Sequence, residues 1–115
     1  MATTPKAQNN YKKITKLDLS NQNLTSFPDY VFKMTNLRKL ILHNNHISKI
    51  PPQIKALSKL MVLDLSNNEL SIIGYQVLKL PKLKILNLCY NQIVCLPNGI
   101  KEVGIKQLLL SNTRL

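Results

Sequence analysis

The sequence is poor in the residues from which many catalytic sites and complex cores are built. It has no Trp, two Phe, four Tyr and three Gly among its 115 residues. With so few aromatic residues, the core must consist mostly of Leu and Ile, which favours repeating aliphatic packing over an irregular enzyme core. Three glycines are too few for a phosphate-binding cradle, and no HExxH, Walker-type glycine-rich loop or GxGxxG motif is present. These absences exclude the common nucleotide-binding and zinc-hydrolase signatures, and we expect no cofactor.

Cysteines and long apolar runs are also scarce. Cys89 and Cys95 lie six positions apart, and no second pair exists to complete a disulfide framework or a four-ligand zinc site. Residues 1–10 lack the apolar run of a signal peptide, and no apolar stretch approaches the length that spans a membrane. We therefore expect two free thiols, no metal, no membrane span and a cytoplasmic location.

Acidic residues are outnumbered. Sixteen Lys and Arg face five Asp and Glu, which gives a formal net charge of +11. Such a charge favours acidic partners and makes association with a polyanion depend on salt. The lysines fall on many different parts of the repeats, so we expect that they mainly keep the protein soluble. They are not interleaved with aromatic residues, and the sequence therefore predicts no specific nucleic-acid site. A basic, polyanion-binding accessory factor stays open as an alternative.

What the chain does have is an internal repeat of the form L-x-x-L-x-L-x-x-N-x-L. Its central leucine recurs at positions 17, 40, 63, 86 and 108, so the period is 23 residues and shortens to 22 in the last copy. Asn45, Asn68 and Asn91 occupy the asparagine position of the middle copies, whereas Gln22 and Thr113 replace it in the terminal ones. Each copy except the last continues with a second apolar half, as in Ile50-Pro51 followed by Ile54 and Leu57.

This pattern resembles the leucine-rich repeat family, in particular the 23-residue class of Ras-suppressor-like proteins. The resemblance covers residues 14–115, and three full copies with asparagine in register make it specific. It implies an α/β repeat solenoid, a horseshoe of about 4.5 repeats with a short parallel β-sheet on the concave face and irregular or 3₁₀ convex arms. It also implies a partner protein, and the partners of this family include signalling proteins such as small GTPases and phosphatases.

The alternation of side chains explains the repeat physically. In the short L-x-L strand the leucines point into a shared core that no single repeat can form alone, and their neighbours point to solvent. Each asparagine can satisfy backbone groups of a buried loop, so the three should form an internal ladder. Residues 1–13 match no repeat, and we expect a polar tail or a partial cap in which Tyr11 covers the first core layer. Residues 14–115 form the repeat domain.

The outward positions of the strands are the predicted protein-binding face. Aliphatic residues there, at positions 41, 62, 85 and 109, are not required by the scaffold, and exposed apolar groups of this kind mark partner surfaces. Nearby charges would set partner choice and on-rate. The predicted site consists of Lys16, Asp18, Lys39, Ile41, His43, Val62, Asp64, Ile85, Asn87, Cys89, Tyr90 and Leu109.

Catalysis by these residues is disfavoured by their spacing. Asp18 and Asp64 stand two repeats apart, about 10 Å by strand spacing, and no insertion brings another catalytic group near them. His43 and Cys89 are equally separated, beyond the ~3 Å reach that activation of a nucleophile needs. The sequence therefore predicts a non-catalytic interaction module.

The C-terminal end suggests an alternative role. The last copy stops eleven positions into the repeat, without a polar cap over its leucines, so either the chain is truncated or another chain covers this end. An uncapped edge strand with exposed leucines favours association. A homodimer formed by a structural or assembly protein is therefore an alternative, with Leu108, Leu110 and Leu115 in its interface.

Overall fold

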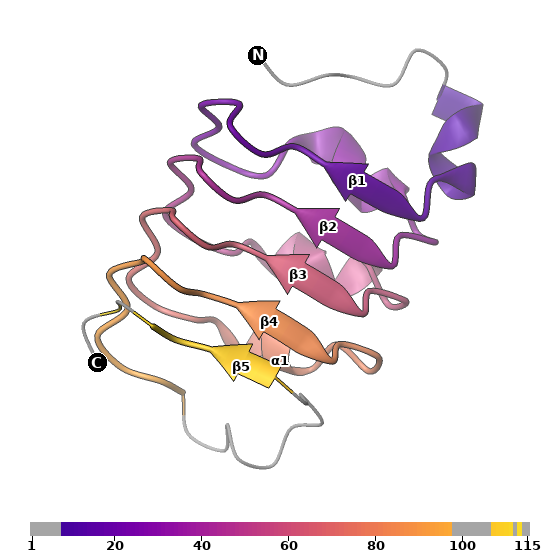
Figure 1. Ribbon diagram of the computed structural model, residues 1–115. Helices are drawn as coiled ribbons and strands as arrows, with labels where there is room; N and C mark the ends of the chain where they lie inside the picture. The colour runs from indigo at the N-terminus through magenta and orange to yellow at the C-terminus, as the bar shows by residue number, and fades with distance from the viewer. Residues whose placement is uncertain (1–7, 98–106, 112, 114–115) are drawn as a thin grey trace.

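The computed structural model describes residues 8–97, 107–111 and 113, and in these the repeats stack into a coil with a sheet on one side. Five three-residue strands form the sheet in the order β1-β2-β3-β4-β5, all parallel (Figure 1). Their bounds are β1 Lys16–Asp18, β2 Lys39–Ile41, β3 Val62–Asp64, β4 Ile85–Asn87 and β5 Gln107–Leu109. This is the repeat solenoid that the sequence predicts.

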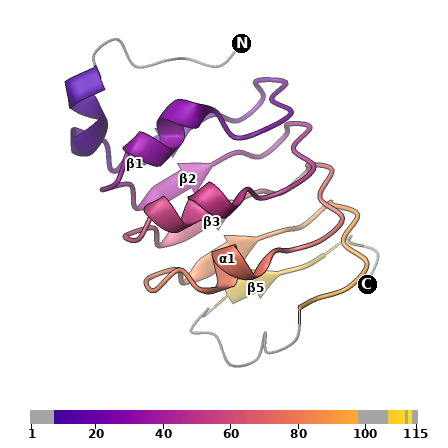
Figure 2. The ribbon, with the colours of Figure 1, turned by 180° about the vertical axis from the view of Figure 1, so that it is seen from behind.

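In the three repeats whose convex arm the structure describes, the opposite side carries one short helical turn each, seen from behind in Figure 2. Two are 3₁₀ helices, η2 Asp29–Lys33 and η3 Pro52–Ala56, and the third is a single α-helical turn, α1 Tyr75–Leu78. Proline precedes or opens both 3₁₀ helices, where its fixed φ and missing N–H are tolerated. In the third repeat Gly74 replaces this proline, and the turn there is α-helical.

A single aliphatic core fills the space between the sheet and the helical turns. The central leucines of β2, β3 and β4, namely Leu40, Leu63 and Leu86, are completely buried. They meet apolar residues of the turns such as Val31 and Ile54, which are also fully buried. Each repeat thus contributes one layer to a core shared with its neighbours, and stability depends on adjacent repeats.

The buried asparagines join successive repeats, as the sequence predicts. The Nδ2 group of Asn68 donates to the carbonyls of Leu42, Leu65 and Ser66, and its Oδ1 accepts from the N–H of Ile47. Asn45 and Asn91 make equivalent bonds one repeat earlier and one later. The ladder therefore consists of side-chain bonds to backbone, which satisfy groups that burial would otherwise leave unpaired.

Before the first repeat lies the 3₁₀ helix η1, Gln8–Lys13. Tyr11 of this helix is buried, belongs to the core and stacks on Tyr30, with ring centroids 6.1 Å apart. At the other end Thr113, which stands in the asparagine position, donates its hydroxyl to the carbonyl of Leu110 at 3.0 Å. Residues 1–7 of the expected tail and Leu115 of the expected dimer interface lie outside the described residues.

Candidate functional site

The strand register assembles the predicted binding residues into columns across the sheet. Lys16, Lys39, Val62, Ile85 and Gln107 are successive partners in the first column. Asp18, Ile41, Asp64, Asn87 and Leu109 are partners in the second. The columns sit on the solvent side of the strands, because the residue between them in each strand packs into the core.

A third column follows the strands. It is held by backbone bonds between repeats, in which Asn44 N–H donates to the carbonyl of Ser66 and Asn67 N–H to that of Cys89. Tyr90 N–H donates in the same way to Ser111 at 2.9 Å. His43, Ser66 and Cys89 therefore lie side by side at the carboxyl ends of the strands.

The aliphatic members of the face are partly accessible. Ile41, Val62 and Ile85 are half-buried, and Leu109 is 39% exposed. Val62 and Ile85 are direct partners in the first column. The structure thus brings aliphatic side chains from β2, β3, β4 and β5 onto one surface.

The polar members of the second column have a structural role that the sequence analysis missed. Asp18 Oδ1 accepts the N–H of Ser20 at 3.0 Å, and Asp64 Oδ1 accepts both the N–H and the hydroxyl of Ser66. Asn87 accepts the N–H of Cys89 in the same way. A side-chain oxygen bonded to the N–H two residues later forms an Asx turn, which ends the strand locally. In the sequence, these turns are marked by an Asp or Asn two residues before a Ser or Cys.

These bonds also affect ionisation. The N–H of Ser20, followed by its hydroxyl, lowers the pKa of Asp18 below the ordinary value of 3.8, because both donors favour the charged carboxylate. Nearby His43 and Lys16 lower that pKa further. Asp18 thus presents a fixed negative charge at neutral pH.

The possible catalytic pairs remain apart. His43 and Cys89 follow β2 and β4, with β3 between them, and Asp18 and Asp64 belong to β1 and β3, with β2 between them. Strands spaced about 4.8 Å apart put each pair beyond hydrogen-bond reach. Across the described parts of the chain, no three His, Cys, Asp or Glu side chains are arranged to hold a metal ion. Both cysteines are free thiols, Cys89 half-buried and Cys95 exposed.

Tyr90 stands out at the end of β4. Its side chain is 60% exposed, and its backbone is left-handed with φ of 59°. The preceding repeats have Asn21, Asn44 and Asn67 at this position, each also with positive φ. Asparagine tolerates this conformation far better than a bulky residue. A tyrosine that replaces it is a candidate contact residue, because strained backbone is often kept at functional positions.

Exposed apolar residues also extend from Tyr90 toward the convex side. Ile72 is 57% and Val94 is 58% exposed, and Cys95 occupies in the next repeat the position of Ile72. The earlier repeats have Ser26 and Lys49 at that position, and Thr25 and Ser48 at the position of Val94. The position of Ile72 and Cys95 is therefore polar in the first two repeats and less polar in the next two. The position of Val94 stays polar through the third repeat, where Ser71 occupies it. Sequence reasoning missed this change although the aligned repeats contain it.

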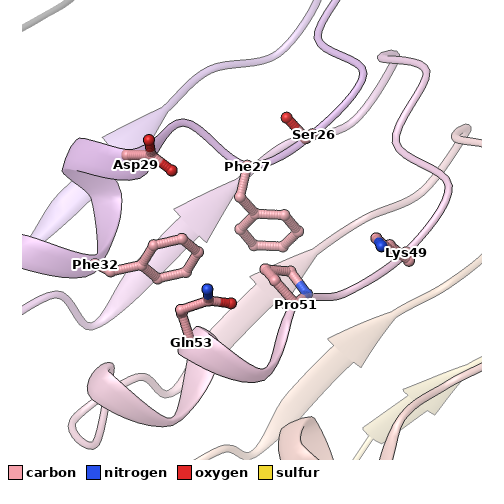
Figure 3. Close-up of a pocket in the computed structure, with 7 residues that line it drawn as sticks. All are labelled: Ser26, Phe27, Asp29, Phe32, Lys49, Pro51 and Gln53. Carbon is pink, nitrogen blue, oxygen red and sulfur yellow. The ribbon is translucent and has the colours of Figure 1, made fainter.

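One pocket opens on the convex side between η2 and η3, with a volume of about 160 Å³ (Figure 3). Phe27 and Phe32 stack with centroids 6.0 Å apart and face Pro51 across it, while Asp29 and Lys49 lie toward its ends. Ligand pockets usually measure about 300 Å³ or more. This one has room for a single side chain and brings no pair of predicted site residues together.

A second hollow, of about 340 Å³, lies where the chain enters the sheet. It is lined by Arg38, Lys59, Met61 and Lys82, which come from three consecutive turns of the coil. Lys59 and Lys82 are therefore not dispersed surface charge, as the sequence suggests, because the repeat places them at one hollow. The 23-residue spacing of the two lysines was the available signal.

Comparison with known proteins agrees with this architecture. The family model for the leucine rich repeat matches residues 12–54, 35–93 and 58–115, which together span nearly the whole chain. The chain belongs to the leucine-rich repeat family. No curated protein sequence matches it significantly.

Two solved structures show the same repeat architecture. A leucine-rich repeat protein of Leptospira interrogans is 26% identical with a TM-score of 0.75, and the match covers 98% of this chain and 35% of that one. An internalin of Listeria monocytogenes is 25% identical with a TM-score of 0.73, over 90% of this chain and 29% of the internalin. This leucine-rich repeat chain thus spans about a third of the length of either protein. Within its described residues, no helix is long and apolar enough to cross a membrane.

Proposed function

We propose that this leucine-rich repeat domain is a non-catalytic protein-interaction module that binds a partner protein on the concave sheet. Leucine-rich repeat domains commonly mediate protein–protein interactions. The observation that carries the choice of face is the set of half-buried or exposed aliphatic side chains, Ile41, Val62, Ile85 and Leu109, on the solvent side of four adjacent strands.

The proposed contact surface contains the residues predicted from the sequence. The aliphatic residues supply the apolar centre, and Lys16, Lys39 and Asp18 supply charges at the β1 and β2 end. At the β4 end Tyr90 adds a large exposed ring, and tyrosines often dominate the energetics of interfaces. His43, Asp64, Asn87 and Cys89 complete the surface between them. The cytoplasmic location and the signalling class of the partner remain parts of this proposal.

Charge insertion tests the face. Ile41→Glu combined with Ile85→Glu should abolish binding of a partner recovered with the wild-type chain, as measured by calorimetry. The matched control is Ile72→Glu combined with Val94→Glu, which changes two exposed apolar residues outside the strands and should retain most of the affinity. Retained binding in the first variant, or equal loss in the control, would contradict the concave assignment. Circular dichroism should show folded protein for both.

A second candidate, self-association, rests on β5. Leu108 and Leu110 are only partly buried, Leu109 between them is 39% exposed, and β5 pairs with β4 alone within the described part of the chain. Leu110→Asp should then convert a dimer into a monomer in light scattering at rising protein concentration. A wild-type chain that stays monomeric throughout would remove this candidate.

A further inference from the structure

We propose that the edge where the chain enters the sheet recognises carboxylates, and that the bound partner segment is acidic. The surface, called the basic edge below, consists of Arg38, Lys59 and Lys82, the three cations that line the hollow of about 340 Å³. The inference rests on the proposed concave binding and specifies the chemistry of the partner.

The backbone fixes this edge. Arg38 N–H donates to the carbonyl of Thr15 at 2.7 Å, Met61 N–H to that of Arg38 at 2.8 Å, and Lys84 N–H to that of Met61 at 2.9 Å. Positions just before β2, β3 and β4 are therefore linked in one ladder. Because the ladder repeats with the strand spacing, side chains at equivalent positions stand about 4.8 Å apart.

One of the lysines is also held by a side-chain bond. Lys59 Nζ donates to Asn36 Oδ1 at 2.7 Å, and Asn36 Nδ2 donates to the carbonyl of Lys12 at 2.7 Å. Asn36 occupies in the previous repeat the position of Lys59, and Lys82 occupies it in the next. A cation held in place loses less side-chain entropy when it binds an anion.

The basic edge has no neutralising partner within the residues that the structure describes. Among the described residues, the ion pair is formed by His46 and Glu69, which lie at the other edge of the sheet. Asp18 and Asp64 bond to Ser20 and Ser66 at the carboxyl ends of their strands. Adjacent like charges repel each other, and an anion seated among three cations relieves that repulsion.

The basic edge continues directly into the aliphatic face. Met61, which lines the hollow, directly precedes Val62 of β3, and Val62 pairs with Ile85 of β4. One step along the chain therefore leads from the hollow to two adjacent apolar side chains. A ligand that fills both surfaces must carry apolar groups beside carboxylates. A protein segment that alternates acidic and aliphatic residues has this chemistry.

Nucleic acid fits the same surface less well. Single-strand binding uses aromatic side chains as stacking platforms among the cations. The hollow is lined by Arg, Lys and Met, and the exposed Tyr90 follows β4 at the opposite edge of the sheet. The described residues of the basic edge thus provide charge without stacking.

The test uses three fluorescent probes: poly-L-glutamate, a synthetic peptide of alternating Glu and Leu, and oligodeoxythymidine. The triple charge reversal Arg38→Glu, Lys59→Glu, Lys82→Glu is compared with Lys33→Glu, Lys49→Glu, Lys55→Glu, whose lysines are exposed outside the strands. Both variants change the net charge equally. The basic-edge variant should weaken both acidic probes at least about tenfold more than the control does, because rim charges act locally at moderate salt.

Three results would overturn the inference. Equal weakening by the two triple variants would mean that net charge alone attracts the probes. Failure of the wild-type chain to bind poly-L-glutamate would mean that the edge holds no carboxylates. Tighter binding of oligodeoxythymidine than of either acidic probe, lost in the basic-edge variant, would make the ligand a nucleic acid.

A further pair of substitutions separates this inference from the concave proposal. Val62→Ser with Ile85→Ser should weaken the Glu/Leu peptide and leave poly-L-glutamate binding unchanged. If these substitutions have no effect on the peptide while the basic-edge variant weakens both acidic probes, the concave proposal fails and the basic edge stands. The reverse pattern would overturn the basic edge and keep the concave face.

Discussion

Tyr90 follows β4 at the repeat position that Asn67 occupies after β3, and both residues have a left-handed backbone, with φ of 59° and 54°. The Nδ2 group of Asn67 donates to Oδ1 of Asn44, so the asparagines at this position form a bonded pair on the surface. Tyr90 interrupts that series with an exposed ring. The same position therefore serves the turn in early repeats and presents an aromatic contact in the fourth.

Tyr90→Asn should stabilise the fold while weakening the partner complex. A non-glycine bulky residue in the left-handed region costs roughly 1–2 kcal/mol, and asparagine relieves part of that cost. Chemical denaturation should therefore show a higher free energy of unfolding. The reverse change, Asn67→Tyr, should lower it. A Tyr90→Asn variant of lower stability would show that favourable packing of the tyrosine ring outweighs the strain of its left-handed backbone.

The asparagine ladder should dominate local stability. Asn68→Ala removes bonds to three carbonyls and one N–H, and each buried group left unsatisfied costs about 1–3 kcal/mol. We expect a loss of at least about 3 kcal/mol in urea denaturation, which is large for a domain of this size. Glu69→Ala is the control, because its pair with His46 is more than half exposed and contributes under about 1 kcal/mol. Similar losses in both variants would contradict a structural role confined to the ladder.

The helix η1 should act as a cap on the first repeat. Tyr11→Ala opens a cavity beside Tyr30 and should lower the free energy of unfolding by about 2–4 kcal/mol. Hydrogen exchange should accelerate first in the backbone amides of β1. Tyr11→Phe keeps the ring and should be close to wild type. Unchanged exchange in β1 after Tyr11→Ala would show that the first repeat is stable without this cover.

The pH dependence of Asp18 follows from its turn. Its folded pKa is lowered, so the stability it contributes is present above the unfolded pKa near 3.8 and is lost as pH falls through the lower folded value. Carboxyl ¹³C NMR should find that the pKa of the Asp18 side chain lies below 3.8. Ser20→Ala should raise this pKa only in part, because the backbone N–H of residue 20 remains as a donor. Full return to the ordinary value in Ser20→Ala would assign the effect to the hydroxyl.

The fold could be predicted from the sequence because the same leucine and asparagine positions recur from repeat to repeat. Leu40, Leu63 and Leu86 define the strand register by their spacing, and the asparagine positions define where the chain leaves each strand. The convex turns were predictable as short helical segments, but the α-helical turn at Tyr75–Leu78 was not distinguished from the 3₁₀ helices elsewhere.

The sequence predicts which residues of the candidate site share a column on the sheet, but it predicts less of what their side chains bond to. Alternation along the strands places Ile41 and Val62 at the surface without any structure. The Asx turn of Asp64 and the basic edge around Lys59 depend on how loops stack between repeats, and hydrophobic periodicity carries no information about loop stacking. Aligning the loops as well as the leucines recovers both features.

Site-specific photo-crosslinking can determine whether the partner binds the concave sheet. A photoreactive residue would be introduced at Val62 on β3 in one variant and at Lys55 in η3 on the convex side in another, with the partner present in both. Val62 is half-buried on the solvent side of the sheet and Lys55 is exposed, so both positions accept the probe. We expect adducts from position 62 that disappear with Ile41→Glu and Ile85→Glu, and few adducts from position 55. Adducts from position 55 alone would contradict binding at the concave sheet.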